Sequence, residues 1–338
     1  MEIKEAIARL IGHTSLNEAE MVEIMTQIMT GGATPAQIGS FLTALRMKGE
    51  SVDEITGAAR VMREKAHRVN VRAERVIDTC GTGGDQRGTY NISTTAAFVV
   101  AGAGITVAKH GNRSVSSRSG SADVLAALGV KIEAPKEKTE ECLEKIGIGF
   151  LFAPLLHEAM RHAIGPRREI GVRTIFNLLG PLTNPAFATH QLVGIYDPEL
   201  TRLAAEVLQK IGSRRAMVVH GLEGLDEISL SGPTKISELL DGRVKDYTVT
   251  PEEFGLKRCR IEELSGGSPE ECAAILRAVL QGEKGPRRDV ALLNAGAALY
   301  VSGSAGSMVE GINQAAASID SGKAREKLEQ LVGMTNAG

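Results

Sequence analysis

Apolar residues in roughly the first 68 positions recur every three or four residues, which is the spacing of one face of an amphipathic helix. The four stripes begin at Ile3, Met21, Ile38 and Ile55. Capping boxes at 34–37 and 51–54 mark two helix starts, and Asn17 can cap a third. Because no stretch here reads as a strand, residues 1–70 are predicted to form a small all-α helical domain.

The pattern changes near residue 75, where short runs rich in β-branched residues alternate with helical stretches. The runs that predict strands are Arg75–Cys80, Ile105–Lys109, Phe150–Ala153, Gln191–Tyr196 and Ala216–His220. The stretches that predict helices are Ser93–Ala103, Ala122–Leu128, Glu199–Ile211 and Glu270–Leu280, followed by a helical tail over Val290–Met334. A hairpin is expected around Gly242 and Arg243. The alternation predicts an α/β fold, in which residues 71–338 form a larger domain with a mostly parallel central sheet flanked by helices.

Composition excludes several classes of protein. Hydrophobic residues make up 43% and charged residues 24% of the chain, which is typical of a globular protein and excludes a disordered one. The formal charge is 39 − 41 = −2, which argues against a nucleic-acid partner. The four cysteines contain no CxxC pair, which excludes a zinc ribbon. No signal-peptide pattern opens the chain, and the run 94–108 is too short to cross a bilayer, so we expect a cytoplasmic protein without a membrane partner.

In open α/β sheets, ligands bind at the carboxyl ends of the strands, so the loops after the predicted strands are searched first for chemistry. In residues 78–85, three glycines in four positions leave backbone N–H groups free to surround an anion. The next helix opens with Ser93 and Thr94, and a helix N-terminus is a phosphate-binding feature. A purely structural turn is the alternative, because neither a Walker A nor a GxGxxG motif is present.

Two further loops carry charge. Residues 109–121 combine three cations with several serines, as a doubly charged phosphate requires, although a solvated polar loop is the alternative. Residues 220–227 end in Asp226 and Glu227, adjacent carboxylates that suit Mg²⁺ already coordinated by substrate phosphates. A solvated acidic loop explains that pair equally well. Together the three loops indicate a phosphorylated small molecule, complexed with Mg²⁺, bound across several strand ends.

These loops belong to a series of motifs that closely resembles the anthranilate phosphoribosyltransferases of tryptophan biosynthesis. The matching stretches are 81–85, 91–94, 109–117, 119–123, 167–171, 173–177, 180–185, 220–221 and 225–227, in order along nearly the whole chain. The resemblance implies a nucleoside phosphorylase-like phosphoribosyltransferase fold. It also implies a homodimer formed through the helical domain, with the helical segment around 168–180 packed on the N-terminal helices.

The reaction implied is transfer of the phosphoribosyl group of 5-phosphoribosyl 1-diphosphate (PRPP) to the amine of anthranilate, with release of diphosphate and no covalent nucleophile. The positions that match PRPP contacts are Gly81, Gly84, Asp85, Thr89, Asn91, Ile92, Ser93, Thr94, Lys109, His110, Gly111, Asn112, Arg113, Ser114, Val115, Ser116, Ser117 and Ser121. The positions that match anthranilate contacts are Gly81, Asn112 and Arg167, and those that match the anthranilate channel are His110, His157, Gly180 and Pro181. Ser93, Asp226 and Glu227 match the ligands of Mg²⁺, of which two per subunit are expected.

Two other functions stay open at this point: a pyrimidine nucleoside phosphorylase of the same fold, and a non-enzymatic relative that binds nucleic acid. Cys80 has no nearby His in the sequence and is expected to be a packed thiol, while His220 is equally compatible with a structural and a functional role. The chain departs from the family pattern at Gln86 and Arg87, where glycine often follows the aspartate, and at Glu158, where proline is usual.

Overall fold

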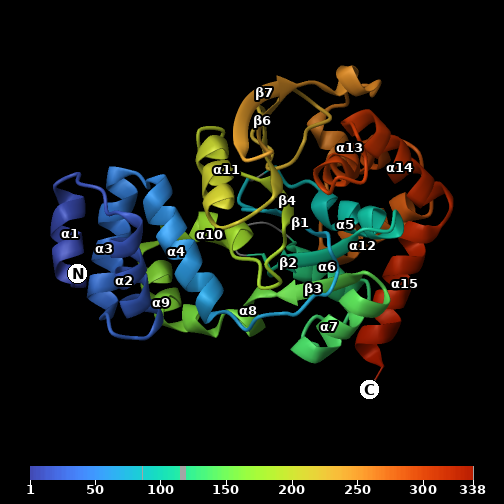
Figure 1. The fold of residues 1–338 in the computed structure, drawn as a ribbon. Coiled ribbons are helices and arrows are strands. Elements are labelled where there is room, and N and C mark those ends of the chain that lie inside the picture. The colour runs from blue at the N-terminus through green and yellow to red at the C-terminus, as the bar shows by residue number, and fades with distance from the viewer. Residues whose placement is uncertain (86, 115–118, 338) are drawn as a thin grey trace.

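A seven-stranded sheet forms the centre of the larger part of the protein (Figure 1). The computed structural model describes residues 1–85, 87–114 and 119–337. In sheet order the strands are β3 (Ile148–Phe152), β2 (Thr106–Gly111), β1 (Val76–Gly81), β4 (His190–Gly194), β5 (Arg215–Gly221), β6 (Thr234–Leu240) and β7 (Arg243–Val249). Neighbours from β3 to β5 are parallel, whereas β6 and β7 pair antiparallel. The mostly parallel sheet is therefore confirmed.

Helices cover both faces of this sheet. One face carries α5 (Ile92–Gly102), α6 (Ser121–Ala127), α12 (Pro269–Leu280), α13 (Pro286–Val301), α14 (Met308–Asp320) and α15 (Lys323–Asn336). The other face packs against α10 (Phe176–Leu182) and α11 (Leu200–Lys210). Along β5, Met217 and Val219 enter the first core and Val218 enters the second, as the period of two along a strand requires.

The N-terminal helices form a bundle beside the sheet (Figure 1). They are α1 (Ile3–Ile11), α2 (Glu18–Met29), α3 (Pro35–Lys48) and α4 (Val52–Lys65). From the middle of the chain, α9 (Arg161–Ile170) packs on α2 and α3, and α10 packs on α4. The small helical part and the larger α/β part agree with the predicted fold class.

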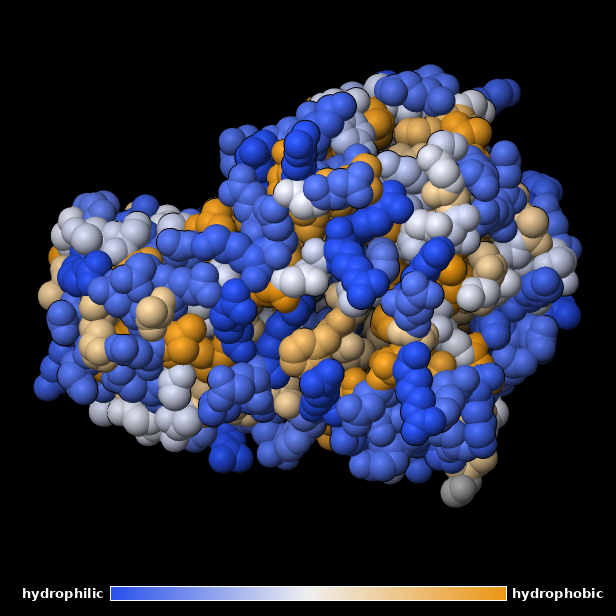
Figure 2. Space-filling view, in the orientation of Figure 1, coloured by the Kyte–Doolittle hydropathy of each residue, from blue (hydrophilic) through white to orange (hydrophobic). Residues whose placement is uncertain are grey.

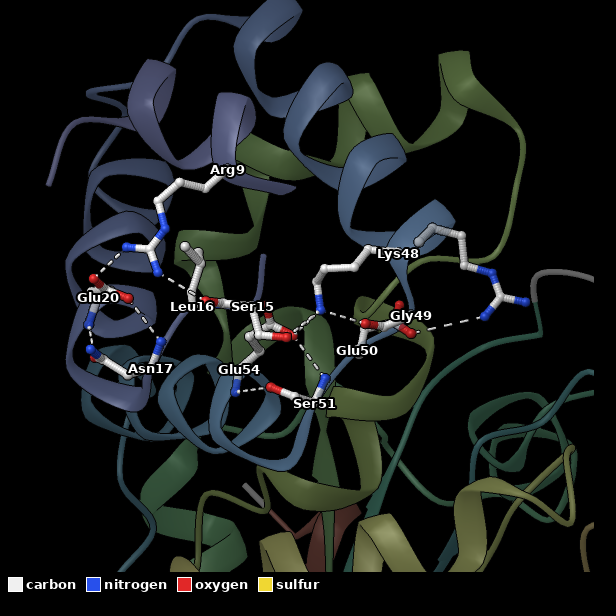
Figure 3. Close-up of polar contacts among 11 residues, drawn as sticks. Arg9, Ser15, Leu16, Asn17, Glu20, Lys48, Gly49, Glu50, Ser51 and Glu54 are labelled. Carbon is white, nitrogen blue, oxygen red and sulfur yellow. Dashed lines mark hydrogen bonds and ion pairs between the residues drawn. The ribbon is translucent and has the colours of Figure 1, made fainter. Parts of the chain in front are cut away.

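A buried ion pair stabilises the bundle between α3 and α4 (Figure 3). The Nζ of Lys48 lies 2.9 Å from Oε2 of Glu54, whose side chain is fully buried. The same carboxylate accepts the backbone N–H of Ser51 at 2.8 Å and that of Leu16 at 3.0 Å. Glu54 therefore caps its own helix and anchors the preceding chain, so its charge is paired and hydrogen-bonded as a buried charge must be.

The remaining elements connect these layers. They are α7 (Lys136–Lys145), α8 (Ala153–Leu156), and the short 3₁₀ helices η1 (Glu158–Met160), η2 (Pro251–Phe254) and η3 (Ile261–Leu264). The predicted hairpin joins β6 to β7 through Asp241 and Gly242, both at positive φ. Within the described ranges, no helix has the length and apolar character needed to cross a membrane.

Candidate active site

Three loops meet at the carboxyl-end edge of the sheet, after β1, β2 and β5. The backbone N–H of Gly83 donates to Oδ2 of Asp226 at 2.8 Å, so the first and third loops are in direct contact. A Cβ on Gly81 would lie 2.6 Å from the same oxygen, and one on Gly194 would lie 1.6 Å from the Asp226 carbonyl. These two glycines therefore allow residues 220–227, called the acidic loop below, to lie directly on the ends of β1 and β4.

Carboxylates gather where the loops meet. Desolvation, with Asp85 and Glu227 nearby, raises the pKa of Asp226 well above its ordinary value. Desolvation also raises the pKa of Glu227, against the attraction of Lys109. A divalent cation would relieve this repulsion, and carboxylate oxygens are the ligands that Mg²⁺ prefers. In the described part of the chain no group of three or more His, Cys, Asp or Glu is arranged to hold a metal ion.

The N-terminus of α5 faces the same carboxylates. The backbone N–H of Ser93 donates to Oε1 of Glu227 at 3.1 Å. The hydroxyl of Thr94 is buried and has no hydrogen-bond partner among the described residues. Ile92 lies between the predicted contacts, but its side chain is buried in the core and its N–H donates to the Tyr90 carbonyl at 2.7 Å. This helix start therefore offers an anion the Ser93 and Thr94 hydroxyls rather than the Ile92 side chain.

Lys109 supplies a buried positive charge at the end of β2. Its side chain is 3% exposed, and its Nζ donates to the Thr79 carbonyl at 2.5 Å and to the Ser93 hydroxyl at 3.5 Å. Desolvation lowers the pKa of Lys109, while the negative charges of Asp78 and Glu227 act in the opposite direction. The ammonium group therefore lies between residues 78–85, called the glycine loop below, and the start of α5, beside the acidic loop.

Asp78 and Asn184 position this end of β2. The buried Asp78 carboxylate accepts the backbone N–H of His110 at 3.1 Å and the side-chain amide of Asn184 at 2.7 Å. The same amide nitrogen donates to the Ala108 carbonyl at 2.8 Å. These two residues, which the sequence reasoning did not select as site residues, thus fix the backbone on both sides of Lys109. Asn184 belongs to the motif 180–185, whose density of turn-forming residues was the available signal.

The loop after β2 is closed on itself by Asp123. Its carboxylate accepts the N–H groups of Ser114 and Gly120 at 3.0 and 2.9 Å and pairs with Arg113 at 3.0 Å. The Arg113 guanidinium is thus already engaged with an acidic side chain. The Ser121 hydroxyl donates to the Asn112 carbonyl at 3.4 Å, at the start of α6. The predicted contacts Val115, Ser116 and Ser117 lie outside the described residues.

Residues predicted to line the anthranilate channel, called the second subsite below, come together at the end of β2. The rings of His110 and His157 are 5.2 Å apart, and Nδ1 of His110 lies 3.1 Å from the Gly180 carbonyl. Burial lowers the pKa of His110 to about 3 and that of His157 to about 4, so both rings are neutral at pH 7. The Nε2 atom of each ring is buried without a partner among the described residues. Neutral rings of this kind suit the wall of an aromatic channel.

Arg167 on α9 is the cation predicted to bind anthranilate. It is half-buried, and its guanidinium lies 4.9 Å from the centroid of the Phe176 ring. Burial lowers its pKa, and within the described ranges no carboxylate is paired with it. A planar cation that stacks on a ring and lacks an acidic partner is suited to bind the carboxylate of a ligand in bidentate fashion.

Other candidate residues make contacts within the fold. Cys80 is buried, and desolvation raises its pKa well above the ordinary thiol value, so it is no nucleophile at neutral pH. The imidazole Nδ1 of His220 lies 2.6 Å from the carbonyl of Ile195, the residue after β4, and so ties the ends of β5 and β4 together. Thr89 and Asn91 sit at the base of the glycine loop, where Thr89 bridges to Ser265 and the Asn91 side chain meets the Ser119 hydroxyl at 3.5 Å.

Comparison with known proteins places this geometry in a family. Residues 73–325 match the glycosyl transferase family a/b domain, and residues 4–66 match the helical bundle domain of that family. The chain is 57% identical over 330 residues to the anthranilate phosphoribosyltransferase of Moorella thermoacetica, covering 98% of this chain and 97% of that protein. It is 53% identical over 335 residues to the enzyme of Acetivibrio thermocellus, with 99% and 97% covered.

Solved structures give the same result. The crystal structure of anthranilate phosphoribosyltransferase from Thermus thermophilus is similar at a TM-score of 0.94 and 46% identity, covering 98% of this chain and 99% of that one. The Saccharomyces cerevisiae enzyme in complex with PRPP and Mg is similar at a TM-score of 0.90 and 28% identity, covering 98% and 97%.

Proposed function

Because the chain belongs to the anthranilate phosphoribosyltransferase family, we propose that its strand-end site performs the reaction of that family. The enzyme transfers the phosphoribosyl group of PRPP to the amine of anthranilate, giving N-(5-phosphoribosyl)anthranilate and diphosphate in tryptophan biosynthesis. The observation that carries the assignment is the convergence of Lys109, the glycine-loop amides and the Asp226–Glu227 pair at the strand ends.

The diphosphate end of PRPP is assigned to the three loops. Lys109 contributes the positive charge, and the backbone N–H groups of residues 81–85 and the hydroxyls of Ser93 and Thr94 contribute donors. Ser93, Asp226 and Glu227 would hold Mg²⁺, which when bound neutralises the diphosphate and helps it leave. Two cations per subunit are proposed, because the three carboxyl groups of Asp85, Asp226 and Glu227 interact with one another in this part of the site.

Anthranilate is assigned to the subsite on the other side of Lys109. Arg167 would bind the anthranilate carboxylate, and Asn112, which directly follows β2, would lie on the path between the two substrates. The neutral rings of His110 and His157, with the carbonyl of Gly180 and the buried Pro181, would line the channel. Gly81, at the end of β1, would face both substrates.

The chemistry then follows from the positions of these groups. An arylamine is neutral at pH 7, so its lone pair can attack the anomeric carbon without a strong base. The costly event is departure of the diphosphate, whose growing negative charge Lys109 and the loop amides can stabilise in a desolvated site. Holding the amine behind the anomeric carbon supplies much of the remaining acceleration. No residue need form a covalent intermediate.

A homodimer formed through the helical bundle is also proposed. Met47 and Ile11 are 78% and 67% exposed on α3 and α1, and Ile164 on α9 is exposed on the same bundle. Apolar surface is visible among hydrophilic residues over the bundle in Figure 2. Exposed apolar patches of this kind mark protein interfaces, and a matching patch on a second copy would cover them. The cytoplasmic location stays a prediction.

The experiment that tests this function mixes the purified protein with anthranilate, PRPP and Mg²⁺ and follows anthranilate fluorescence. Loss of fluorescence that requires all three components supports the transferase. Phosphate-dependent release of uracil or thymine from a nucleoside, without use of anthranilate, would instead indicate a nucleoside phosphorylase. Salt-sensitive binding of DNA without turnover of either substrate pair would indicate the non-enzymatic alternative.

A further inference from the structure

The motif 173–177 has no role in the substrate contacts proposed above, yet its first residue touches the glycine loop. Nη2 of Arg173 donates to the carbonyl oxygen of Gly84 at 2.5 Å. The Arg173 guanidinium also lies 4.2 Å from the centroid of the Tyr196 ring, just after β4. Tyr196 in turn donates its backbone N–H to the Thr82 hydroxyl at 3.1 Å. The glycine loop is therefore held from its outer side at two positions, by Arg173 and by the backbone of Tyr196.

This contact determines which way one peptide group of the loop points. In a planar trans peptide, the C=O and the following N–H point in opposite directions. Since the Gly84 carbonyl points at Arg173, the N–H of Asp85 points away from it, and that N–H donates to no described residue. Gly83 and Gly84 both have positive φ, and because glycine populates positive and negative φ with similar ease, the loop can adopt other shapes unless it is held.

The same short segment also supports the anthranilate side. The N–H of Thr174 donates to the Asn177 side chain at 2.9 Å, which fixes the turn that leads into α10. The guanidinium of Arg167 stacks on the ring of Phe176, which lies three residues after Arg173. Residues 173–177 thus contact the diphosphate loop at one end and the arginine of the second subsite at the other.

From these contacts, and resting on the proposed function, we infer that Arg173 is a positioning residue for the diphosphate of PRPP. It touches neither substrate. It orients the Gly84–Asp85 peptide so that the Asp85 N–H faces the anion, and it fixes the glycine loop relative to Arg167. Loss of the guanidinium should therefore weaken the use of PRPP and leave the affinity for anthranilate nearly unchanged, because Arg167 keeps its support on Phe176.

The test compares Arg173→Gln and Arg173→Lys with the wild-type enzyme. Arg215→Gln is a matched control, because Arg215 also stacks on a tyrosine, Tyr300 at 4.9 Å, but lies at the start of β5, at the opposite edge of the sheet. For each protein, kcat and the KM of both substrates are measured, together with calorimetric binding of PRPP with Mg²⁺ in the absence of anthranilate. Thermal melting verifies that each variant is folded.

We expect Arg173→Gln to raise the KM and Kd of PRPP about ten-fold, the loss of one charge-assisted hydrogen bond, with the KM of anthranilate within about two-fold. Arg173→Lys keeps a cation and a donor but not the stacked fork, so it should raise the PRPP constants by less. Arg215→Gln should behave as wild type. Should Arg173→Gln fail to fold, Arg173→Lys alone decides in the same direction.

Unchanged PRPP constants in a folded Arg173 variant would overturn the inference, and so would an equal rise in the KM of both substrates. A wild-type enzyme that binds PRPP but does not consume anthranilate would contradict the proposed function and not the inference, since PRPP binding by the variants would still be compared. The two failures are therefore distinguishable in one set of measurements.

Discussion

Replacing Arg167 by Ala should separate the two halves of the site most cleanly. Arg167 is half-buried on α9, has no carboxylate partner within the described ranges, and stacks on Phe176. Its removal therefore breaks no ion pair of the free enzyme. What is lost in the folded protein is the stacking on Phe176, worth about 0.5–1 kcal/mol at a partly exposed site. Stability should change little.

The effect on anthranilate should be much larger. A hydrogen bond to a charged group contributes about 1.5–3 kcal/mol, and about 1.4 kcal/mol corresponds to a ten-fold change in affinity. Losing the carboxylate contact of Arg167 should therefore raise the KM of anthranilate by about 10- to 100-fold. The KM of PRPP should stay within about two-fold, because Lys109 and the three loops are untouched.

The assay is steady-state loss of anthranilate fluorescence with each substrate varied in turn. Arg168→Ala, the neighbouring exposed arginine on the same helix, is the matched control and should behave as wild type. Lys109→Ala should give the converse pattern, with weakened use of PRPP. The reasoning is refuted if both substitutions raise the KM of both substrates equally, or if Arg167→Ala leaves the KM of anthranilate unchanged.

Three further predictions concern buried titratable side chains. Desolvation raises the pKa of Glu227, so protons compete with Mg²⁺ for this carboxylate. The Mg²⁺ concentration that gives half-maximal activity should therefore rise as pH falls. Glu227→Gln should raise this Mg²⁺ concentration at every pH and make it less dependent on pH. Burial lowers the pKa of His190 to about 4, so below about pH 6.5 the unfolded chain binds more protons than the folded protein. The free energy of unfolding should therefore fall as pH falls from about 6.5 toward 4. Between pH 7.5 and 4.5, urea unfolding should show that His190→Gln loses about 2 kcal/mol less free energy of unfolding than wild type. Glu54→Gln removes the charged partner of the buried Lys48 and should lower the free energy of unfolding by about 3–5 kcal/mol. Glu64→Gln, at an exposed ion pair, is the control and should change the free energy of unfolding by less than about 1 kcal/mol. Both free energies are measured by chemical denaturation.

Much of the fold is predictable from local pattern because its strands are distinctive. The five parallel strands are short, mostly apolar runs, and the structure places both ends of each strand within two residues of the predicted ends. By contrast, α7 has no predictable stripe, since only Thr139, Cys142 and Leu143 are buried along its ten residues. A mostly charged helix of this kind gives a weak periodic signal.

Contacts between distant segments could not be predicted in the same way. The loops rich in glycine and serine indicate an anion site by composition alone, but the partners that hold them do not. Arg173 lies 89 residues from Gly84, and Asn184 lies 106 residues from Asp78. Only the order of strands in the sheet brings such residues together, and β1 lies beside β4 rather than beside β3. Positioning residues therefore emerge from topology, whereas binding loops emerge from sequence.

The most direct test of the account is a crystal structure of the enzyme with PRPP, Mg²⁺ and 4-fluoroanthranilate, an analogue present in a related yeast structure. We expect the diphosphate between Lys109 and the amides of residues 81–85, a metal on Asp226 and Glu227, and the analogue's carboxylate on Arg167. An analogue carboxylate bound away from Arg167, or a diphosphate bound away from the glycine loop, would contradict it.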